Sequence, residues 1–476
     1  MPIAVARRLL PPGSIVGVSC NTPAHVHAAV RDGADYIGIG AVYGTQTKKL
    51  TEPLVGVRGI AAMLDGLGES PIKAVAIGGI KATNALRILH SAIAPNGRPL
   101  DGVAIVSDIV ASREPAASAT KLSRLIRAFQ QEFATGIGIH SRATIVGSIA
   151  VEPALERVQS LFQEIKKSSP LVHQITNNVV ATQSANITLA VGASPIMATA
   201  ADEMEDLSRI PGALLVNIGT LVPDTKLGML EAGYFANLNG KPIVLDPVGI
   251  GASTFRKSSV NGTCSSLRRN VQPIIKLCNV ELLDRWQPSV IKGNAGELAA
   301  FAGSTEVKSK GVDSVGSGFS DPALFVQALA RQERCIVVLT GKTDYVSDGH
   351  LVVCIENGHE LLGQITGAGC MAGSLIATFC AAQASLTRGQ SGSAAIEGQL
   401  VDRGMLYAAV GGLLTLEIAA EQAVPADGSA VGRGTFLSRL IDRVGFLTQD
   451  DITRLAKISI QVPGSPKEST RTGLRE

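Results

Sequence analysis

Short apolar, β-branched runs alternate with helix-like stretches along most of this sequence, and that alternation limits the possible fold more than any other feature. The first series, between residues 14 and 110, consists of SIVGVSC, DYIGIGAV, IKAVAIGGI and DGVAIVSDI. Each run is almost uninterruptedly apolar, as a strand buried on both faces is, and each is followed by polar or glycine-rich residues and then a helical segment. The alternation predicts parallel sheets covered by helices, an α/β fold.

Length and composition agree with this fold class. At about 150 residues per domain, a chain of 476 residues predicts two or three domains. The net charge of +3 is small, and the basic residues are scattered, so no nucleic-acid partner is expected. No apolar run reaches the roughly 18 uninterrupted residues of a membrane helix, and the N-terminal segment lacks the apolar centre of a secretion signal. We therefore expect no membrane association and a cytoplasmic location.

The cysteines also favour a reducing compartment. There are seven of them, an odd number, and none forms a CxxC pair, which argues against a structural zinc site. They are Cys20, Cys264, Cys278, Cys335, Cys354, Cys370 and Cys380.

The first series of strands is typical of the C-terminal half of a (β/α)8 barrel, in which the loops after the last two strands commonly bind phosphate. The third and fourth runs end near Gly78-Gly79 and Val106-Ser107, respectively. The segment GTQTKK, residues 44–49, follows the second run. Hydroxyls and ammonium groups converge in that segment, although a solvated polar loop would have the same composition.

Composition shifts divide the chain further. We predict a barrel-like region at residues 1–130, a linker at 131–150, a second α/β domain at 151–450 and a C-terminal tail at 451–476. The tail, which ends SPKESTRTGLRE, has the composition of a disordered segment.

In the second region, polar residues cluster directly after apolar strands, where an open α/β sheet places its ligands. Asp246 ends a strand before a glycine-rich turn and is a candidate ligand for Mg²⁺, or else a cap of the next helix. Lys292, Asn294 and Glu297 bring a cation, an amide and a carboxylate close together, as a surface helix cap also would.

The stretch GQITGAGCMAGSLIATFC, residues 363–380, begins as a glycine-rich turn and continues as a helix of small residues. The backbone N–H groups of Thr366 to Gly369 would face an anion at the helix start, and Cys370 would lie beside it. A small buried thiol at a helix start is the alternative. Metal-holding acids, an N–H cradle and a positive group together form the set that phosphoryl transfer requires.

The first region resembles the C-terminal half of thiamine-phosphate synthase, through VGVSCNT, DYIGIGAVYGTQTKK, AVAIGGI and DGVAIVSDI. The resemblance implies units 5 to 8 of the barrel, with the N-terminal half absent. It also implies a site for two substrates. The thiazole phosphate would contact Thr45, Thr47, Gly79, Val106 and Ser107, and the pyrimidine diphosphate would face Ser19 and Lys48.

The second region resembles hydroxyethylthiazole kinase, a family with a ribokinase-like fold, through HQITNNVV, GASPIMATAADEMEDL, GALLVNIGTL, DPVGIGAS, IKGNAGE, LTGKTD and TGAGC. The resemblance implies that ATP phosphorylates the alcohol of a hydroxyethylthiazole, that Mg²⁺ is required and that the enzyme is a homo-oligomer, a trimer in this family. The implied roles are substrate contact for Met197, Gly367 and Asn177, ATP or phosphate contact for Lys292, Asn294, Thr340, Thr366, Ala368 and Gly369, and metal contact for Asp246 and Glu297.

Cys370 takes the place of the aspartate that serves as base in related sugar kinases. We expect it to position the substrate hydroxyl and to act as a weak base, provided that the helix start lowers the pKa of the thiol from about 8.5. Two other interpretations stay open. The second region could phosphorylate another small alcohol, and the first region could be a non-catalytic interaction module.

Overall fold

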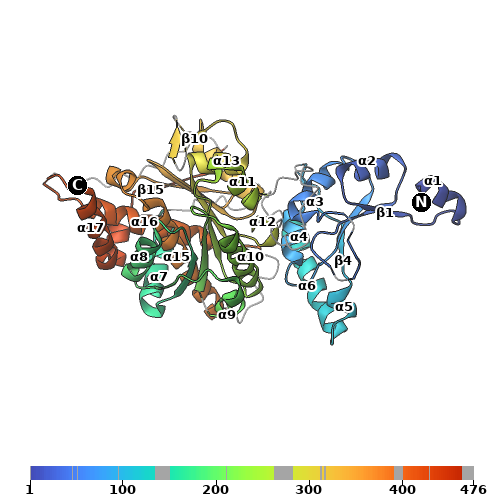
Figure 1. The fold of residues 1–476 in the computed structure, drawn as a ribbon, viewed down its shortest axis with the longest axis horizontal. Helices are drawn as coiled ribbons and strands as arrows, with labels where there is room; N and C mark the ends of the chain where they lie inside the picture. The colour runs from blue at the N-terminus through green and yellow to red at the C-terminus, as the bar shows by residue number, and fades with distance from the viewer. Residues whose placement is uncertain are drawn as a thin grey trace. The chain divides into compact units, whose positions relative to one another are not determined.

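The structure, a computed structural model, describes residues 2–45, 47–50, 52–94, 96–134, 151–210, 212–261, 282–310, 313–315, 318–390, 400–427 and 429–463. The chain divides into two compact units, one made chiefly of residues 1–143 and the other chiefly of residues 144–476 (Figure 1). Both units are α/β, which confirms the predicted fold class.

The first unit contains four βα units, as the strand pattern predicts. Its strands are β1 (Gly17–Cys20), β2 (Tyr36–Ile39), β3 (Lys73–Ile77) and β4 (Gly102–Ala104). Its helices are α1 (Ile3–Leu9), α2 (Pro23–Arg31), α3 (Gly56–Asp65), α4 (Ala85–Ser91), α5 (Ser107–Val110) and α6 (Pro115–Ala134). The strands form one parallel sheet in the order β1-β2-β3-β4, so their carboxyl ends lie at one edge.

Helices cover only one face of this sheet. Ile37, Ile39 and Ala76 are buried in the core under the helices, whereas the alternate residues Tyr36 and Ile77 are about 40% exposed. A parallel sheet is normally covered on both faces or closed into a barrel. Among the described residues, the exposed face of this sheet therefore lacks the cover that is usual for a parallel sheet.

The second unit is larger. Its strands are β5 (Leu171–Ile175), β6 (Ser194–Ile196), β7 (Gly212–Asn217), β8 (Ile243–Asp246), β9 (Val290–Asn294), β10 (Lys308–Lys310), β11 (Asp313–Val315), β12 (Ile336–Thr340), β13 (Asp344–Ser347), β14 (Val352–Ile355) and β15 (Ile458–Gln461). Its α-helices are α7 (Val151–Ser168), α8 (Ala181–Val191), α9 (Met204–Arg209), α10 (Pro223–Leu238), α11 (Thr254–Asn261), α12 (Leu282–Arg285), α13 (Ala295–Ala302), α14 (Pro322–Glu333), α15 (Ala368–Gln390), α16 (Met405–Gln422), α17 (Arg433–Phe446) and α18 (Gln449–Leu455). Within the described residues, short 3₁₀ helices lie at Ala201–Glu203, Ile250–Ala252 and Glu360–Gln364.

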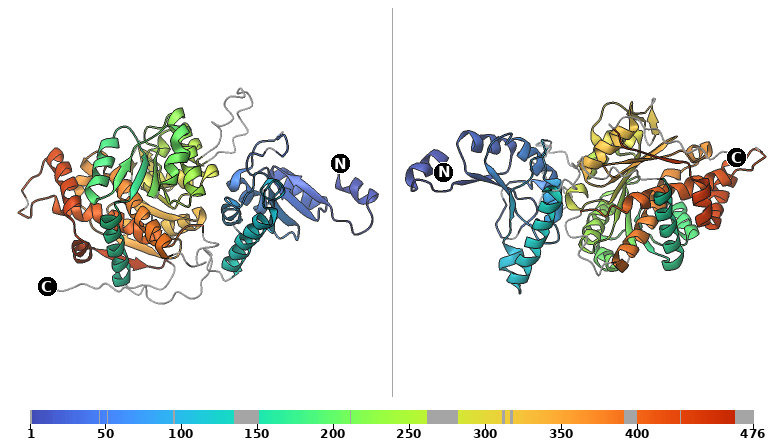
Figure 2. Two further views of the ribbon diagram at one scale, coloured as in Figure 1. Left: turned by 90° about the horizontal axis from the view of Figure 1, so that it is seen from below. Right: turned by 180° about the vertical axis from the view of Figure 1, so that it is seen from behind.

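Nine strands form one sheet in the order β15-β14-β13-β12-β9-β8-β7-β5-β6. The strands from β12 to β6 pair in parallel, and β13, β14 and β15 extend the sheet in antiparallel fashion. A separate antiparallel pair joins β10 to β11. The sheet lies between two layers of helices (Figure 2).

Successive residues of each central strand point into different cores. In β7, Leu215 packs with α7, α15 and α16, while Leu214 and Val216 pack on the other face with α10. This explains why the central strands are apolar throughout rather than alternating. Among the described residues, one helix, α15, is long and apolar enough to cross a membrane, but 83% of its apolar window is buried as the central helix of this layer.

The start of the predicted C-terminal tail is ordered, so the prediction of disorder is wrong there. Residues of α18 pack on α7 and α16, and β15 pairs with β14, with Ile458 opposite Ile355. β15 thereby becomes the edge strand of the large sheet. The rest of the tail, residues 464–476, lies outside the described residues.

Candidate active site

Polar side chains gather where the parallel strands of the second unit end. Because these strands are parallel, their carboxyl ends meet at one edge of the sheet. The residues at this edge are Asn177 shortly after β5, Asn217 at the end of β7, Asp246 at the end of β8, Lys292 and Asn294 near the end of β9, and Thr340 at the end of β12.

A buried ion pair forms the centre of the cluster. Lys292 Nζ lies 3.2 Å from Asp246 Oδ1, and Asn217 Nδ2 donates to Asp246 Oδ2 at 2.9 Å. Asp246 and Lys292 are 0% and 2% exposed. Burial raises the pKa of Asp246, against the opposing charge of Lys292. Burial by itself would lower the pKa of Lys292, but the nearby carboxylates outweigh it and raise that pKa, so Lys292 keeps its charge.

Glu297 lies beside this pair and also caps α13. Its Oε2 accepts the backbone N–H of Asn294 at 2.9 Å, and the Asn294 side chain accepts the N–H of Glu297 at 2.9 Å. Its Oε1 accepts the N–H of Gly249, in the turn after β8, at 3.0 Å. The capping arrangement is therefore present, but it is buried, and burial raises the pKa of Glu297 to about 7.

The start of α15 passes directly over the ion pair. A side chain at Gly369 would place its Cβ 3.1 Å from Lys292 Nζ, and one at Gly373 would place its Cβ 3.3 Å from Asp246 Oδ2. Glycine at these two positions lets the helix backbone approach the buried charges. The N-terminal N–H groups and the Lys292 ammonium thus form one positive region, which favours an anion.

Cys370 lies in the first turn of α15, between two amide groups. Asn217 Nδ2 and Asn177 Nδ2 lie 3.2 Å and 3.4 Å from its Sγ, and Asn177 also donates to Asn217 Oδ1 at 3.0 Å. Burial raises the pKa of the Cys370 thiol to about 11, and the charge of Asp246 adds to that rise. The condition under which Cys370 would act as a base, a pKa lowered by the helix start, is therefore not met, because burial dominates.

The structure brings Asn177, Asp246, Lys292, Glu297 and Cys370 together, as predicted. Asn294 joins them through its two hydrogen bonds with Glu297, and Gly369 through its close approach to Lys292, whereas Thr340, Met197 and Thr366 lie further out. Thr340 is opposite Asn294 in the strand register, and Met197 directly follows β6. Among the described residues, no hydrogen bond links the hydroxyls of Thr340 or Thr366 to the cluster, and Ala368 is the first residue of α15.

Sequence analysis missed two residues of this site. Asn217 contacts both Asp246 and Cys370, and a polar residue ending the apolar run GALLVN could have indicated it. Arg256 in α11 donates to the carbonyl groups of Gly219 and Gly249, so it ties together the turns after β7 and β8. Nothing in the local sequence pattern marks Arg256, because its partners are backbone atoms distant in the chain.

The described residues contain no group of three or more His, Cys, Asp or Glu side chains able to hold a metal ion. Any metal at this edge would therefore have Asp246 and Glu297 as its acidic neighbours. Each of their four carboxylate oxygens accepts one hydrogen bond, so each keeps a second lone pair.

In the first unit, the predicted residues lie at or after the carboxyl ends of the four strands, and Ser19 is the last but one residue of β1. Gly79 lies in the turn after β3, where a Cβ would be 2.6 Å from the carbonyl oxygen of Gly44, just before Thr45. The N–H of Ala82 donates to Asp108 in α5, so this turn also meets the segment after β4. The topology thus brings the predicted residues to one edge of the sheet: Ser19, Thr45, Thr47, Lys48, Gly79, Val106 and Ser107.

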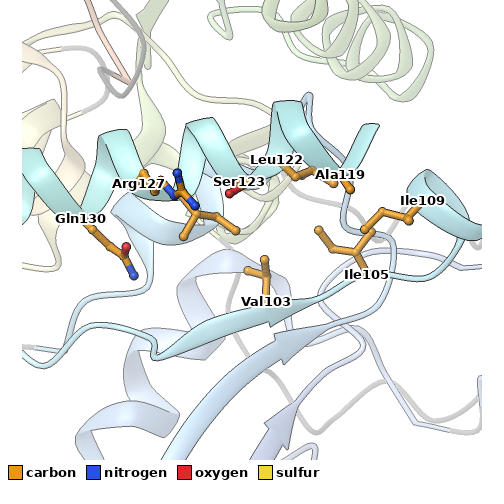
Figure 3. A pocket seen from close by; sticks show the side chains of 9 residues that line it. Val103, Ile105, Ile109, Ala119, Leu122, Ser123, Arg127 and Gln130 are labelled. Carbon is orange, nitrogen blue, oxygen red and sulfur yellow. The ribbon is translucent and has the colours of Figure 1, made fainter. Parts of the chain in front are cut away.

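A groove of about 460 Å³ in the same unit lies elsewhere (Figure 3). It runs between β4 and α6, and Val103, Ile105 and Leu122 give it an apolar lining. None of the predicted site residues lines it. Ile105, directly after β4, and Ile109 of α5 also line it, so the groove reaches past the carboxyl end of this strand.

Comparison with known proteins assigns each unit to a family. Residues 162–450, more than half of the chain, match the hydroxyethylthiazole kinase family. The chain belongs to this family. Residues 1–109 match the thiamine monophosphate synthase family.

Relatives of the kinase family include both fused and single proteins. A probable thiamine biosynthetic bifunctional enzyme of Schizosaccharomyces pombe is 33% identical over 460 residues, which cover 95% of this chain and 79% of that protein. A hydroxyethylthiazole kinase of Chloroflexus aggregans is 38% identical and covers 64% of this chain and 94% of its own length. The solved hydroxyethylthiazole kinase of Pyrococcus horikoshii OT3 covers 64% of this chain at 33% identity, with a TM-score of 0.50.

Replacement of Gly367 by alanine tests whether the turn before α15 has room for a side chain at this position. Gly367 has a φ of +89°, and a Cβ there would lie 2.6 Å from Val180 Cγ1. Gly303 also has a positive φ, +70°, but open space around it. We expect Gly303→Ala to lower the free energy of unfolding by about 1 kcal/mol and Gly367→Ala by about 2 kcal/mol or more, measured by urea unfolding. Equal losses would mean that Val180 moves aside freely.

Proposed function

We propose that this chain is a bifunctional enzyme of thiamine biosynthesis. Its second unit uses ATP to phosphorylate the primary alcohol of 4-methyl-5-(2-hydroxyethyl)thiazole. Its first unit takes part in joining the thiazole phosphate to the hydroxymethylpyrimidine diphosphate, which releases diphosphate. Membership of the kinase family and the synthase match at residues 1–109 support this pairing.

One observation carries the kinase proposal: a buried Lys292–Asp246 pair lies directly beneath the glycine-rich start of α15, beside Cys370. In phosphoryl transfer, catalysis comes almost entirely from positioning and charge stabilisation. Lys292 and the N–H groups from Thr366 to Gly369 would hold the phosphates of ATP, with Asn294 and Thr340 at the adjoining strand ends. Met197, Gly367 and Asn177 would contact the thiazole.

We propose Mg²⁺ as the metal and ATP as the co-substrate. Mg²⁺ prefers one or two carboxylates and completes its coordination with water and substrate phosphates. Asp246 and Glu297 fit this preference, because both carboxylates are buried and both keep free lone pairs. When bound, the ion would neutralise charge on the transferred phosphoryl group.

Cys370 would position the substrate hydroxyl as a neutral thiol. It would not remove the hydroxyl proton as a thiolate. With a pKa near 11, the Cys370 thiol is neutral at physiological pH. The two asparagine amides fix the place of its sulfur, which makes Cys370 a defined contact for a small alcohol. The N–H groups and Lys292 would supply most of the rate by stabilising charge.

For the first unit, we propose that the four βα units correspond to units 5 to 8 of a barrel and need four further units for full activity. The uncovered sheet face and the two free sheet edges support this. Thr45, Thr47, Gly79, Val106 and Ser107 would bind the thiazole phosphate, and Ser19 and Lys48 would face the diphosphate. For the second unit, we propose a ribokinase-like fold.

The domain limits, location and assembly are also proposed. We place the synthase-like domain at 1–130, the kinase domain at 151–450 and a linker at 131–150, and propose a cytoplasmic homo-oligomer with small-molecule substrates. Support for a reducing compartment comes from the free thiols of Cys20, Cys354, Cys370 and Cys380. Cys264 and Cys278 lie outside the described residues.

The test is to incubate the purified chain with Mg-ATP, the hydroxyethylthiazole alcohol and the pyrimidine diphosphate, and to follow both products separately. We expect thiazole phosphate to form and thiamine phosphate to form slowly or not at all. Efficient formation of both would contradict the proposal that the first unit needs further βα units. Formation of neither, by a chain with an intact circular dichroism spectrum, would contradict the assigned substrate.

A further inference from the structure

We propose that Asp344 is a positioning residue for the nucleotide of the kinase reaction, because it fixes the turn that carries Thr340. The inference rests on the proposed kinase function. Asp344 contributes no atom to the cluster around Lys292, and nothing in the mechanism above uses it.

The first step of the argument is the geometry of the turn. Thr340 is the last residue of β12, and its hydroxyl makes no hydrogen bond to any described residue, so it is available to a ligand. The chain then turns through Gly341 to Thr343 and enters β13 at Asp344. Asp344 Oδ1 accepts the N–H of Gly341 at 2.8 Å, and its side chain is 4% exposed. The carboxylate therefore closes the turn immediately behind Thr340.

The second step is the support that Asp344 receives from α16. Its carboxyl group is hydrogen-bonded to that of Glu417, which is 6% exposed, and within the described part of the chain Glu417 Oε2 has no partner. Burial raises the pKa of both groups, and for Glu417 the charge of Asp344 raises it further. Two buried carboxyl groups in contact share one proton. We assign that proton to Glu417, which donates it to Asp344.

The charges that face the pair agree with this assignment. Lys292 favours the ionised form of Asp344, and Glu421, one turn along α16, disfavours ionisation of Glu417. Of the two carboxyl groups, Asp344 is thus the one whose ionised form is the more favoured. Its charge strengthens the hydrogen bond from Gly341, because bonds to ionised acceptors are the stronger ones.

The third step is the position of Glu417 relative to α15. Helices α15 and α16 pack in antiparallel fashion. Along α16 the positions Gly404, Gly411 and Gly412 approach successively earlier residues of α15, which are Gln383, Phe379 and Ile376. Glu417, further along α16, therefore lies toward the beginning of α15, where Cys370 is. The Asp344–Glu417 pair links the nucleotide turn to the helix layer that carries the phosphate cradle.

Asp344→Asn is the direct test, with Asp402→Asn as the matched control. Asp402 also accepts a backbone N–H, that of Gly404 at 2.7 Å, but it lies near the other end of α15. We expect Asp344→Asn to raise the KM for ATP and the Kd for Mg-ADP about tenfold, with the KM for the thiazole alcohol unchanged. Asp402→Asn should leave all three unchanged. Glu417→Gln should change them less than about twofold, because an amide still donates to Asp344.

Hydrogen exchange of the unmodified chain gives a second readout that needs no variant. Mg-ADP should slow exchange in the peptide 339–345, and the alcohol alone should not. An unchanged KM for ATP in a folded Asp344→Asn variant, or no effect of Mg-ADP on that peptide, would overturn the role of Asp344 alone. A wild-type chain that neither binds Mg-ADP nor makes thiazole phosphate would overturn the proposed function and this inference with it.

Discussion

Lys292→Met is expected to abolish most kinase activity and to destabilise the second unit. The substitution removes the cation that faces the phosphates and leaves Asp246 buried without its partner. Breaking a buried ion pair in this way typically costs about 3–5 kcal/mol, and the loss of charge stabilisation should lower kcat about 100-fold or more. Urea unfolding and a thiazole phosphate assay measure the two effects separately.

The loss of stability should also depend on pH. Without Lys292, burial still raises the pKa of Asp246, so its carboxyl takes a proton more readily in the folded state than in the unfolded state. The unfolded chain then binds fewer protons than the folded chain above the ordinary pKa of aspartate, and the free energy of unfolding falls as pH rises. Lys292→Met should therefore be less destabilising near pH 5 than near pH 8.

Lys457→Met is the matched control for this prediction. Lys457 pairs with Glu421 at 3.0 Å, but the lysine side chain is 57% exposed. Exposed ion pairs contribute about 0–1 kcal/mol, so this variant should keep nearly full stability and activity. Equal losses in the two variants would show that the Lys292–Asp246 pair has no special role. Lys292→Arg should keep part of the activity, since it preserves the charge.

Cys370→Ala is expected to lower kcat about 100-fold while changing stability little. The thiol is held by Asn177 and Asn217 at the start of α15, and its loss removes a fixed contact for the substrate hydroxyl. Cys380, fully buried ten residues further along α15, is the matched control. Cys380→Ala should leave kcat unchanged. Cys370→Asp should keep activity, because a carboxylate can accept from both amides.

The pH profile separates the two roles considered for Cys370. A thiolate base with a pKa near 11 would make kcat rise about tenfold per pH unit at lower pH. A neutral thiol that only positions the hydroxyl would leave kcat flat between about pH 7.5 and about pH 9.5. We expect the flat profile. A steady rise that Cys370→Ala abolishes would restore the thiolate mechanism.

The strand pattern was sufficient to predict the α/β class and the place of the site. In the second unit, uninterrupted apolar runs correctly predicted strands buried on both faces, and polar residues at their ends therefore had to meet at one edge. This reasoning correctly grouped Asp246, Lys292 and Cys370, although any two of them are separated by more than 40 residues in the sequence. In the first unit the same kind of run was misleading, because one face of that sheet leaves Tyr36 and Ile77 about 40% exposed. Strand β15 was missed, because its run is short and it is stabilised as a strand by pairing with β14, which is distant in the sequence.

Local sequence could not choose between a helix cap and a metal ligand at Glu297, and the structure shows that the carboxylate forms the cap without being at the surface. The same carboxylate caps α13 and, through Gly249, supports the turn after β8. Arg256 was missed for a related reason, since it binds backbone carbonyls whose positions depend on the whole sheet.

The sequence alone determined the alternation of strands and helices, the chemical groups at the strand ends and the family resemblance of each region. Only the tertiary structure decided the ionisation of those groups. A helix start favours a thiolate, but burial beside Asp246 raises the pKa of Cys370 instead, and burial likewise raises the pKa of Glu417. Desolvation depends on every element packed around a group, so no local pattern contains it.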